Sequence, residues 1–313
     1  MLTRELRAAI RAEFSDLRPR DLDAAQTLGR GESAEAVRVG DWVVRIPHGG
    51  LPATDLEAEV RLLQLLERSG VPASPRDSRL LRAADGTPLA MTYRYIEGVP
   101  SRGVRLRGGA RERFAADLGG FLGALHRVPV REARATGLGG GDYWRSVHLP
   151  LIEACRPHLG ARLTAELDRL VGAFEPLLAR APQVLVHGDI SGFHTLIGPD
   201  GSLRGVIDFG YAAIGDPALD LAGVLNDRSR AFLGRVVAHY PHTLDPEALT
   251  RAEVYIALAP LFALSTAAAE GDLDALARAR RHLARGVRAA VERGGAGPYH
   301  RPARTKRGSR VGV

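Results

Sequence analysis

The chain has 313 residues, of which 45% are hydrophobic and 25% are charged, so it is long and apolar enough to fold as a bilobal or two-domain globular protein. No apolar run approaches the roughly 20 residues that span a bilayer, and the charged N-terminal segment MLTRELRAAIRAEF is not a secretory signal. The single cysteine, Cys155, excludes a disulfide framework and fits a reducing compartment, so we expect a cytoplasmic protein with no membrane partner.

The net charge of +7 is concentrated at the C-terminus, where RPARTKRGSRVGV carries five basic residues and no acid. Without those five residues the net charge falls to +2. A short basic tail binds nucleic-acid phosphates weakly, but such tails are more often solvated and disordered. We expect a disordered tail over residues 298–313, no nucleic-acid partner, and a monomer.

Residues 1–98 show the pattern of a small antiparallel sheet with helices. Apolar residues recur at helical spacing in two segments, and β-branched runs alternate with turn dipeptides such as Gly40-Asp41 and Asp85-Gly86. These patterns predict helices over residues 2–14 and 55–68, two or three strands within residues 26–47, and a β-hairpin over residues 79–83 and 89–96.

One of the expected strand connections is rich in glycine, and we call the segment from Leu28 to Ser33 the glycine loop. It contains Gly29, Gly31 and Ser33. Because glycine lets the backbone approach phosphate oxygens closely, this loop is a candidate phosphate-binding loop. An ordinary hairpin turn is the alternative for so short a pattern.

From residue 109 onward the pattern is mainly helical. Apolar side chains at helical spacing indicate core packing, so we assign no chemistry to His126. Tyr143 and Trp144 are candidates for lining a substrate pocket, although packing is the commoner use of such side chains. The expected helices cover residues 110–127, 142–158, 160–180, 220–240, 246–270 and 272–293.

Between these helical segments lies VLVHGDISGFHTLIGPDGSLRGVIDFGYAAIGDPALD, residues 184–220. It reads as three short apolar strands joined by tight turns, with Asp189, His194 and Asp208 at the strand ends. A carboxylate such as Asp208 suits Mg²⁺, and a second carboxylate nearby can accept a proton from a substrate hydroxyl. Phosphoryl transfer needs both groups.

This stretch resembles the antibiotic phosphotransferases, the aminoglycoside and macrolide kinases, which are similar in fold to protein kinases. The family pattern is His-Gly-Asp, an Asn or His five residues after the Asp, Ile-Asp-Phe/Trp-Gly, and then Asp-Pro-x-x-Asp. Here it reads His187-Gly188-Asp189, then His194, then Ile207-Asp208-Phe209-Gly210, then Asp216-Pro217-Ala218-Leu219-Asp220.

The resemblance implies an α+β, bilobal, protein-kinase-like fold. A small N-terminal β-sheet lobe with one helix, residues 1–98, would bind the nucleotide, and a larger, mainly helical lobe, residues 99–297, would carry catalysis and the substrate. By the same resemblance Asp189 is the catalytic base, and His194 and Asp208 hold Mg²⁺. We interpret Asp220 as a brace that accepts backbone N–H groups of the loop and His187 as a structural hydrogen-bond donor.

The resemblance also implies a nucleotide site for ATP or GTP in the small lobe, with the glycine loop over the phosphates. Arg45 would contact the phosphates from a strand where the wider pattern has Lys. Glu59 on the next helix would be its partner, with Glu57 as the alternative. The carbonyl of Arg94 and the backbone groups of Ile96 would bind the base.

The acceptor implied first is an aminoglycoside-type antibiotic, and hence a role in antibiotic resistance. Because aminoglycosides carry several positive charges, their sites collect carboxylates, and Asp227 is the acid that the family order places best. Three alternatives stay open. The first is a macrolide 2'-phosphotransferase, with an apolar pocket from residues 251–268. The second is a kinase of the same fold for an amino alcohol or sugar, and the third is a non-catalytic nucleotide-binding protein, suggested by Arg45.

Overall fold

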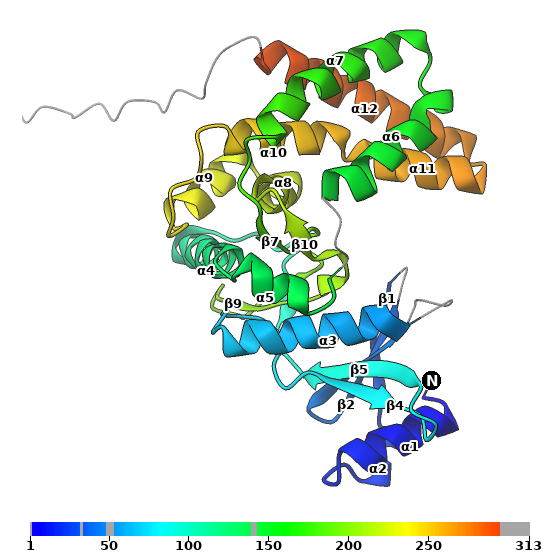
Figure 1. Ribbon diagram of the computed structural model, residues 1–313. Coiled ribbons are helices and arrows are strands. Elements are labelled where there is room, and N and C mark those ends of the chain that lie inside the picture. Colours follow the sequence, from blue (N-terminus) through cyan, green and yellow to red (C-terminus); the bar gives the residue numbers. More distant parts are fainter. Residues whose placement is uncertain (1, 32–33, 48–52, 139–142, 295–313) are drawn as a thin grey trace, which may run out of the picture.

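The computed structural model describes residues 2–31, 34–47, 53–138 and 143–294. Figure 1 shows a small lobe built around a sheet and a larger helical lobe, which are connected by the segment between β5 (Pro88–Arg94) and β6 (Val99–Pro100). The predicted α+β, bilobal architecture is confirmed. The tail expected at residues 298–313 lies outside the described residues.

The small lobe is a five-stranded antiparallel sheet in the order β1-β2-β3-β5-β4. Its other strands are β1 (Gln26–Arg30), β2 (Ala34–Val39), β3 (Trp42–Pro47) and β4 (Arg79–Arg82). The β2–β3 hairpin turns at Gly40, whose φ of +57° favours glycine. Strand β3, which carries Arg45, therefore lies at the centre of the sheet between β2 and β5.

The two faces of this sheet pack into different cores. Helix α3 (Ala53–Arg68) covers one face, where Val43 and Met91 join a core that continues into the large lobe. Helices α1 (Arg4–Glu13) and α2 (Pro19–Asp23) cover the other face (Figure 1), and there the ring of Phe14 lies 4.1 Å from that of Trp42. Because alternate residues of a strand point to opposite faces, Arg45 shares the α3 face with Val43.

Short strands lie where the large lobe meets the small one, and helices form the rest of the large lobe (Figure 1). Strand β6 pairs with β8 (Thr195–Ile197), which pairs with β9 (Leu203–Val206), and β7 (Val184–Val186) pairs with β10 (Ala213–Gly215). The helices are α4 (Gly108–His126), α5 (Val130–Ala135), a π-helical turn (Trp144–His148) that continues into α6 (Leu149–Cys155), α7 (Ala161–Leu178), α8 (Ala218–Asp227), α9 (Arg230–Ala238), α10 (Ala248–Leu258), α11 (Pro260–Glu270) and α12 (Leu273–Gly294).

Two of the expected long helices are each a pair of helices. The segment expected as one helix over residues 220–240 breaks at Arg228, which is extended, and restarts at Ser229, whose hydroxyl accepts from the N–H of Phe232 at 3.2 Å. The segment over residues 246–270 breaks before Pro260, which lacks the N–H that would continue the helix. The sequence patterns also missed α2, α5, β6 and β10.

One apolar stretch is longer than the sequence analysis expected. Ala248–Glu270, which spans α10 and α11, is long and apolar enough to cross a membrane by length and composition, and 44% of its apolar 18-residue window is buried inside the protein. Its side chains Leu258, Leu261 and Leu264 are fully buried in the core of the large lobe. This stretch has the pattern of a core helix pair, which satisfies the same length and hydropathy criteria.

Candidate active site

The carboxylate of Asp220 on α8 stabilises the loop after β7 by hydrogen bonds. This carboxylate accepts the backbone N–H groups of His187 and Gly188, both at 2.9 Å, and the Nε2–H of His126 at 3.1 Å. Burial alone would raise the pKa of Asp220, but its hydrogen bond and charge interaction with His126 and the N–H of His187 lower it, so the carboxylate stays ionised. The bracing interpretation of Asp220 is confirmed.

The imidazole of His187 is a structural link between two loops. Its Nδ1 accepts the N–H of Asp189 at 3.2 Å, so its Nε2 carries the proton and donates to the carbonyl of Ile207 at 3.1 Å. Burial lowers the pKa of His187, which favours this neutral form. The loop that carries Asp189 is thereby connected to the segment that carries Asp208.

His194 lies between Asp189, the predicted base, and Asp208, the other predicted metal ligand. Its Nδ1 is 2.9 Å from the backbone carbonyl of Asp189 and 3.3 Å from Oδ2 of the same residue. Both are acceptors, so Nδ1 carries a proton. The other ring nitrogen, Nε2, faces Oδ2 of Asp208 at 3.7 Å. Asp189, His194 and Asp208 therefore converge, as the sequence predicts.

Asp208 adopts a left-handed conformation at the end of β9, with φ of +67° and ψ of +71°. This conformation is uncommon for a residue other than glycine and redirects the chain directly after the strand. Its Oδ1 accepts a hydrogen bond from Nη2 of Arg45, whose Nη1 donates to Glu59 on α3. Glu59, and not Glu57, is thus the partner of Arg45, because Glu57 pairs with Arg82 and Arg61 on the surface.

The guanidinium of Arg45 is a buried cation between two acids. Burial alone would lower its pKa, but the carboxylates of Glu59 and Asp208 outweigh that effect and raise the pKa, so Arg45 stays charged. Each terminal nitrogen of the guanidinium donates to a different carboxylate. A lysine ammonium has a single nitrogen and lacks this planar arrangement of donors. A cation fixed at this point is suited to contact phosphate oxygens.

The donor set of His194 and Asp208 fits a divalent cation that also binds phosphate. No group of three or more His, Cys, Asp or Glu residues that could hold a metal ion occurs among the described residues. Mg²⁺ needs few protein ligands, because phosphate oxygens and water complete its coordination at about 2.1 Å. Nε2 of His194 and Oδ2 of Asp208 lie 3.7 Å apart, and a neutral imidazole with Nε2 unprotonated would let the two groups ligate one ion.

The predicted phosphate and base contacts lie along the small lobe. Gly29 is in β1, the N–H of Gly31 donates to the carbonyl of Ala34 at 2.9 Å across the turn, and Ser33 lies outside the described residues. Arg94 ends β5, and its side chain pairs with Asp77 at 3.0 Å. The base contact expected of its carbonyl stays a prediction. Ile96 packs against Gly205, where an added Cβ would lie 2.8 Å from the Ile96 side chain.

Asp227 at the end of α8 lies against the loop between β7 and β8, which carries the predicted base Asp189 and which we call the catalytic loop. Its Oδ2 is 3.3 Å from Nε of Arg228, and its side chain is 15% exposed. A Cβ added to Gly192 would lie 2.5 Å from this same oxygen. Arg228 in turn donates to the carbonyls of Ser101 and Val104, at 2.5 and 3.0 Å. The pair thus connects α8, the catalytic loop and the segment after β6.

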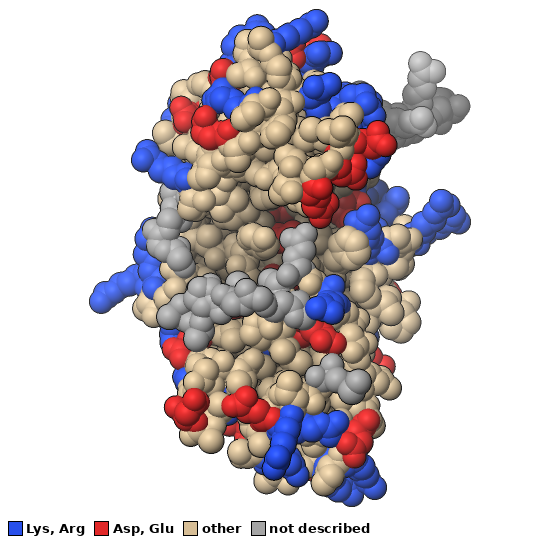
Figure 2. All heavy atoms as spheres, turned by 90° about the vertical axis from the view of Figure 1, so that its right-hand side faces the viewer, with Lys and Arg blue, Asp and Glu red and all other residues tan. Residues whose placement is uncertain are grey.

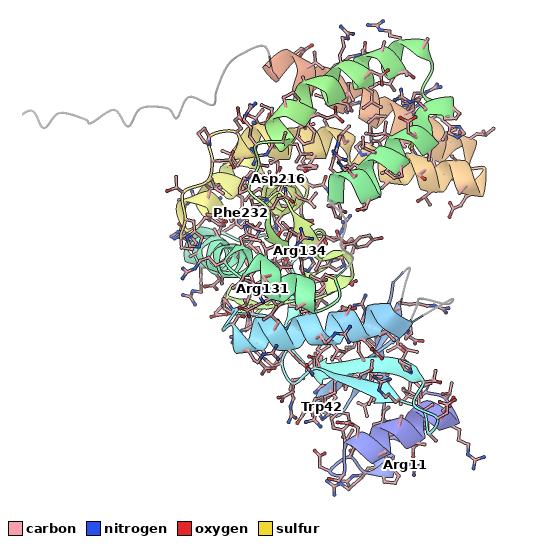
Figure 3. All side chains as sticks on the ribbon, viewed as in Figure 1. Arg11, Trp42, Arg131, Arg134, Asp216 and Phe232 are labelled. Carbon is pink, nitrogen blue, oxygen red and sulfur yellow. The ribbon has the colours of Figure 1, made fainter. Side chains whose placement is uncertain are left out.

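Two features of this region were missed from the sequence. His126, placed in the core, donates to Asp220, and its Nδ1 accepts from the hydroxyl of Tyr240 at 2.8 Å. Asp216 (Figure 3) forms a buried two-point pair with Arg251, at 2.7 and 2.9 Å, and caps α8 through the N–H of Ala218. The sequence signals for these contacts were weak. They were a histidine on an apolar helical face, His126, and an arginine within an apolar helical segment, Arg251.

Figure 2 shows a hollow between the two lobes, with acidic atoms in its depth.

Residues 24–255 match the model of the phosphotransferase enzyme family, which is well over half of the chain. The chain belongs to this family. The predicted resemblance to this family is confirmed.

Three known proteins are similar to this chain. A homoserine kinase from Gluconacetobacter diazotrophicus is 30% identical over 200 residues, which cover 60% of this chain and 58% of that relative. The match therefore spans less than two thirds of the relative. The GDP complex of aminoglycoside 2'-phosphotransferase-IIIa has a TM-score of 0.76 at 26% identity, over 92% of this chain and 99% of that one.

A macrolide 2'-phosphotransferase from Brachybacterium faecium has a TM-score of 0.64 at 26% identity, over 89% of this chain and 97% of that one. These similarities confirm the protein-kinase-like fold of the phosphotransferase. They include one enzyme solved with a bound nucleotide and enzymes named for different acceptors. The comparisons therefore show the family but do not single out one acceptor.

Proposed function

We propose that this phosphotransferase moves the γ-phosphoryl group of ATP or GTP to a hydroxyl group of a small molecule. Asp189 would accept the proton of the acceptor hydroxyl, and Arg45 would contact the nucleotide phosphates. Asp208 and His194 would hold Mg²⁺, which when bound neutralises phosphate charge in such reactions. The observation that carries the proposal is the convergence of Asp189, His194 and Asp208, with Nδ1 of His194 3.3 Å from Asp189 and Nε2 3.7 Å from Asp208.

The remaining predicted contacts keep their places in this proposal. The glycine loop would cover the phosphates, and the backbone of Arg94 and Ile96 would bind the base. Glu59 would hold Arg45 in position, since the two side chains are paired. We assign Asp227 the role of positioning the catalytic loop, because it lies against Gly192 and is paired with Arg228.

We propose an antibiotic of the aminoglycoside type as the first acceptor to test. The support is the similarity to aminoglycoside 2'-phosphotransferase-IIIa over 92% of the chain. An amino alcohol is the second candidate, because the homoserine kinase is 30% identical over 200 residues. A macrolide is the third candidate, with the structural similarity to the macrolide enzyme as its support. In each case the enzyme would act as a monomer in the cytoplasm.

The experiment is a transfer screen with ATP and GTP, each labelled at the γ-phosphate. Kanamycin, erythromycin and L-homoserine are the acceptors, with Mg²⁺ present and with EDTA as the control. We expect labelled product with at least one acceptor and none with EDTA. Nucleotide binding without transfer to any acceptor, and without hydrolysis, would instead support the non-catalytic alternative.

A further inference from the structure

The catalytic loop is connected through two buried side chains to a tyrosine that follows α9. The carboxylate of Asp220 accepts the backbone N–H groups of His187 and Gly188, directly before the proposed base. Nε2 of His126 lies 3.1 Å from the same carboxylate, and Nδ1 of His126 lies 2.8 Å from the hydroxyl of Tyr240. A continuous chain of hydrogen bonds therefore runs from Tyr240 to the backbone that carries the proposed base.

The middle of this chain is closed to water. The side chain of His126 is 2% exposed and that of Asp220 is 0% exposed, whereas Tyr240 is partly buried against the core. A buried carboxylate needs donors for its oxygens, because an unpaired buried charge is costly. Among the described residues, His126 supplies the side-chain hydrogen bond to Asp220, and backbone N–H groups supply the other two. The state of the His126 ring therefore matters to the whole loop.

The hydroxyl of Tyr240 can select which ring nitrogen of His126 carries the proton. A neutral imidazole has one N–H group and one lone pair, and the partner of one nitrogen determines the state of the other. When the hydroxyl donates to Nδ1, Nε2 carries the proton and donates to Asp220. In the opposite tautomer, the lone pair of Nε2 would face the lone pairs of the carboxylate, which is repulsive. Tyr240 thus favours the tautomer that Asp220 needs.

Close packing between α4 and α9 places Tyr240 at this point (Figure 1). Gly119 and Gly123 of α4 lie about one helical turn apart on the same face of the helix. A Cβ added to Gly119 would lie 2.5 Å from the carbonyl oxygen of Val236 on α9. A Cβ added to Gly123 would lie 2.2 Å from Cδ of Pro241. Because the two glycines let the backbones approach, the residue directly before Pro241 is fixed against α4.

We propose that Tyr240 is a positioning residue for the catalytic loop. Its hydroxyl keeps His126 in the tautomer that donates to Asp220, and Asp220 in turn fixes the backbone before the proposed base. The assignment rests on the proposed phosphotransfer, in which Asp189 must meet the acceptor hydroxyl at one point. Tyr240 and His126 act through the position of the loop and not by contact with a reactant. A displacement of about 1 Å at a reacting group can lower a rate by about 10²-fold.

The first test observes the imidazole directly. Nitrogen NMR spectra are recorded at neutral pH on the full chain labelled at histidine, and the His126 signals are assigned by their loss in His126→Gln. We expect Nδ1 without a proton and Nε2 with one in the wild type, and a shift of Nδ1 toward a protonated nitrogen in Tyr240→Phe. The amide proton of Gly188 should also exchange about 5-fold faster in Tyr240→Phe. A doubly protonated His126 in the wild type, or an unchanged spectrum in Tyr240→Phe, would overturn the assignment.

The second test separates positioning from stability. Tyr240→Phe should lower kcat for phosphate transfer about 5-fold and leave the KM for the nucleotide unchanged. His242→Phe is the matched control, because Nε2 of His242 bonds to the carbonyl of Gly123 at 3.2 Å and the ring of His242 lies 5.6 Å from that of Tyr240. This change removes a hydrogen bond of the same segment, retains a ring and leaves the hydroxyl of Tyr240 in place, so kcat should stay near the wild-type value. Equal losses of kcat in the two variants would reduce Tyr240 to a packing role.

A double-mutant cycle tests whether Tyr240 acts through His126. In the His126→Gln background, Tyr240→Phe should lower kcat less than about 2-fold, because both side chains belong to one hydrogen-bond chain. Losses that multiply independently would overturn the assignment. Transfer to no acceptor by the wild type would overturn the proposed phosphotransfer. If the His126 spectrum and the exchange of Gly188 then still depended on Tyr240, the connection from Tyr240 to the loop would stand.

Discussion

Arg45 of β3 donates to Asp208, a residue 163 positions later in the chain, and this hydrogen bond connects the small lobe to the predicted metal ligand of the large lobe. The other arm of the guanidinium binds Glu59 of α3. The Arg45 side chain thus connects β3, α3 and the segment after β9. In the proposed nucleotide site, this cation would contact the phosphates while Glu59 holds it in place.

Glu59→Gln therefore tests the positioning of Arg45. The amide retains the size of Glu59 but loses its charge, and charge-assisted bonds are about twice as strong as neutral ones. We expect the KM for the nucleotide to rise ~10-fold or more. Glu57→Gln on the same helix is the matched control, because Glu57 pairs with surface arginines. Equal effects of the two substitutions in steady-state kinetics would contradict this role of Glu59.

His194 offers a test of the metal ligand itself. Its Nε2 faces Asp208 while its Nδ1–H donates to the carbonyl of Asp189. Asn supplies an oxygen ligand, which hard cations prefer, whereas Ala supplies none. We expect His194→Asn to retain measurable turnover with Mg²⁺ and His194→Ala to lose at least ~10²-fold. Titration of Mn²⁺ by electron paramagnetic resonance gives a second readout, in which weaker binding is expected for His194→Ala alone.

Asp220 is expected to be a stability residue. It accepts three hydrogen bonds in a fully buried position, and its amide analogue would turn an NH₂ group toward one of the three donors. Each lost bond to a charged group costs about 1.5–3 kcal/mol, so we expect Asp220→Asn to lower the free energy of unfolding in urea by at least ~2 kcal/mol. Asp23→Asn, at an exposed pair with Arg7, should change it little.

The buried imidazole of His148 predicts a pH dependence of stability. Its pKa is about 4 in the folded protein, against 6.5 for an ordinary histidine. Between these values the unfolded chain binds a proton that the folded protein excludes, so stability falls as the pH drops from 6.5 toward 4. From pH 7 to pH 5 this group alone accounts for about 2 kcal/mol.

His148→Phe keeps an aromatic ring and removes that titration. We expect the loss of unfolding free energy between pH 7 and pH 5 to be about 2 kcal/mol smaller in the variant than in the wild type. Because burial also lowers the pKa of His187, the difference between the two proteins is the measure. Parallel pH profiles, obtained by urea titration, would show that His148 does not titrate in this way.

The chain order of polar residues made much of the site predictable. Asp189, His194 and Asp208 lie at the ends of three short strands whose turns bring them together, and Glu59 was preferred over Glu57 because it matches the Glu partner in the family pattern. Contacts across long separations were not predictable. The pairing of His126 with Asp220 and that of Arg251 with Asp216 join residues 94 and 35 positions apart, and each partner alone has an ordinary helical pattern.

The same limit explains the errors in the fold. The break between α8 and α9 depends on the cap at Ser229, and the break between α10 and α11 depends on Pro260, yet the apolar periodicity runs through both. Strands β6 and β10 have two and three residues, too short for any period to appear. Local patterns thus predicted the strands that carry the site and missed the short elements that connect it.

Asp189 is the residue on which the proposed chemistry depends most directly. The decisive measurement is transfer of the labelled γ-phosphate to an acceptor by wild type and by Asp189→Asn, each with intact folding and with nucleotide affinity determined independently. The account predicts that kcat falls at least ~10²-fold in Asp189→Asn, as expected for loss of a general base, while nucleotide binding is retained. Turnover at the wild-type rate in Asp189→Asn would contradict it.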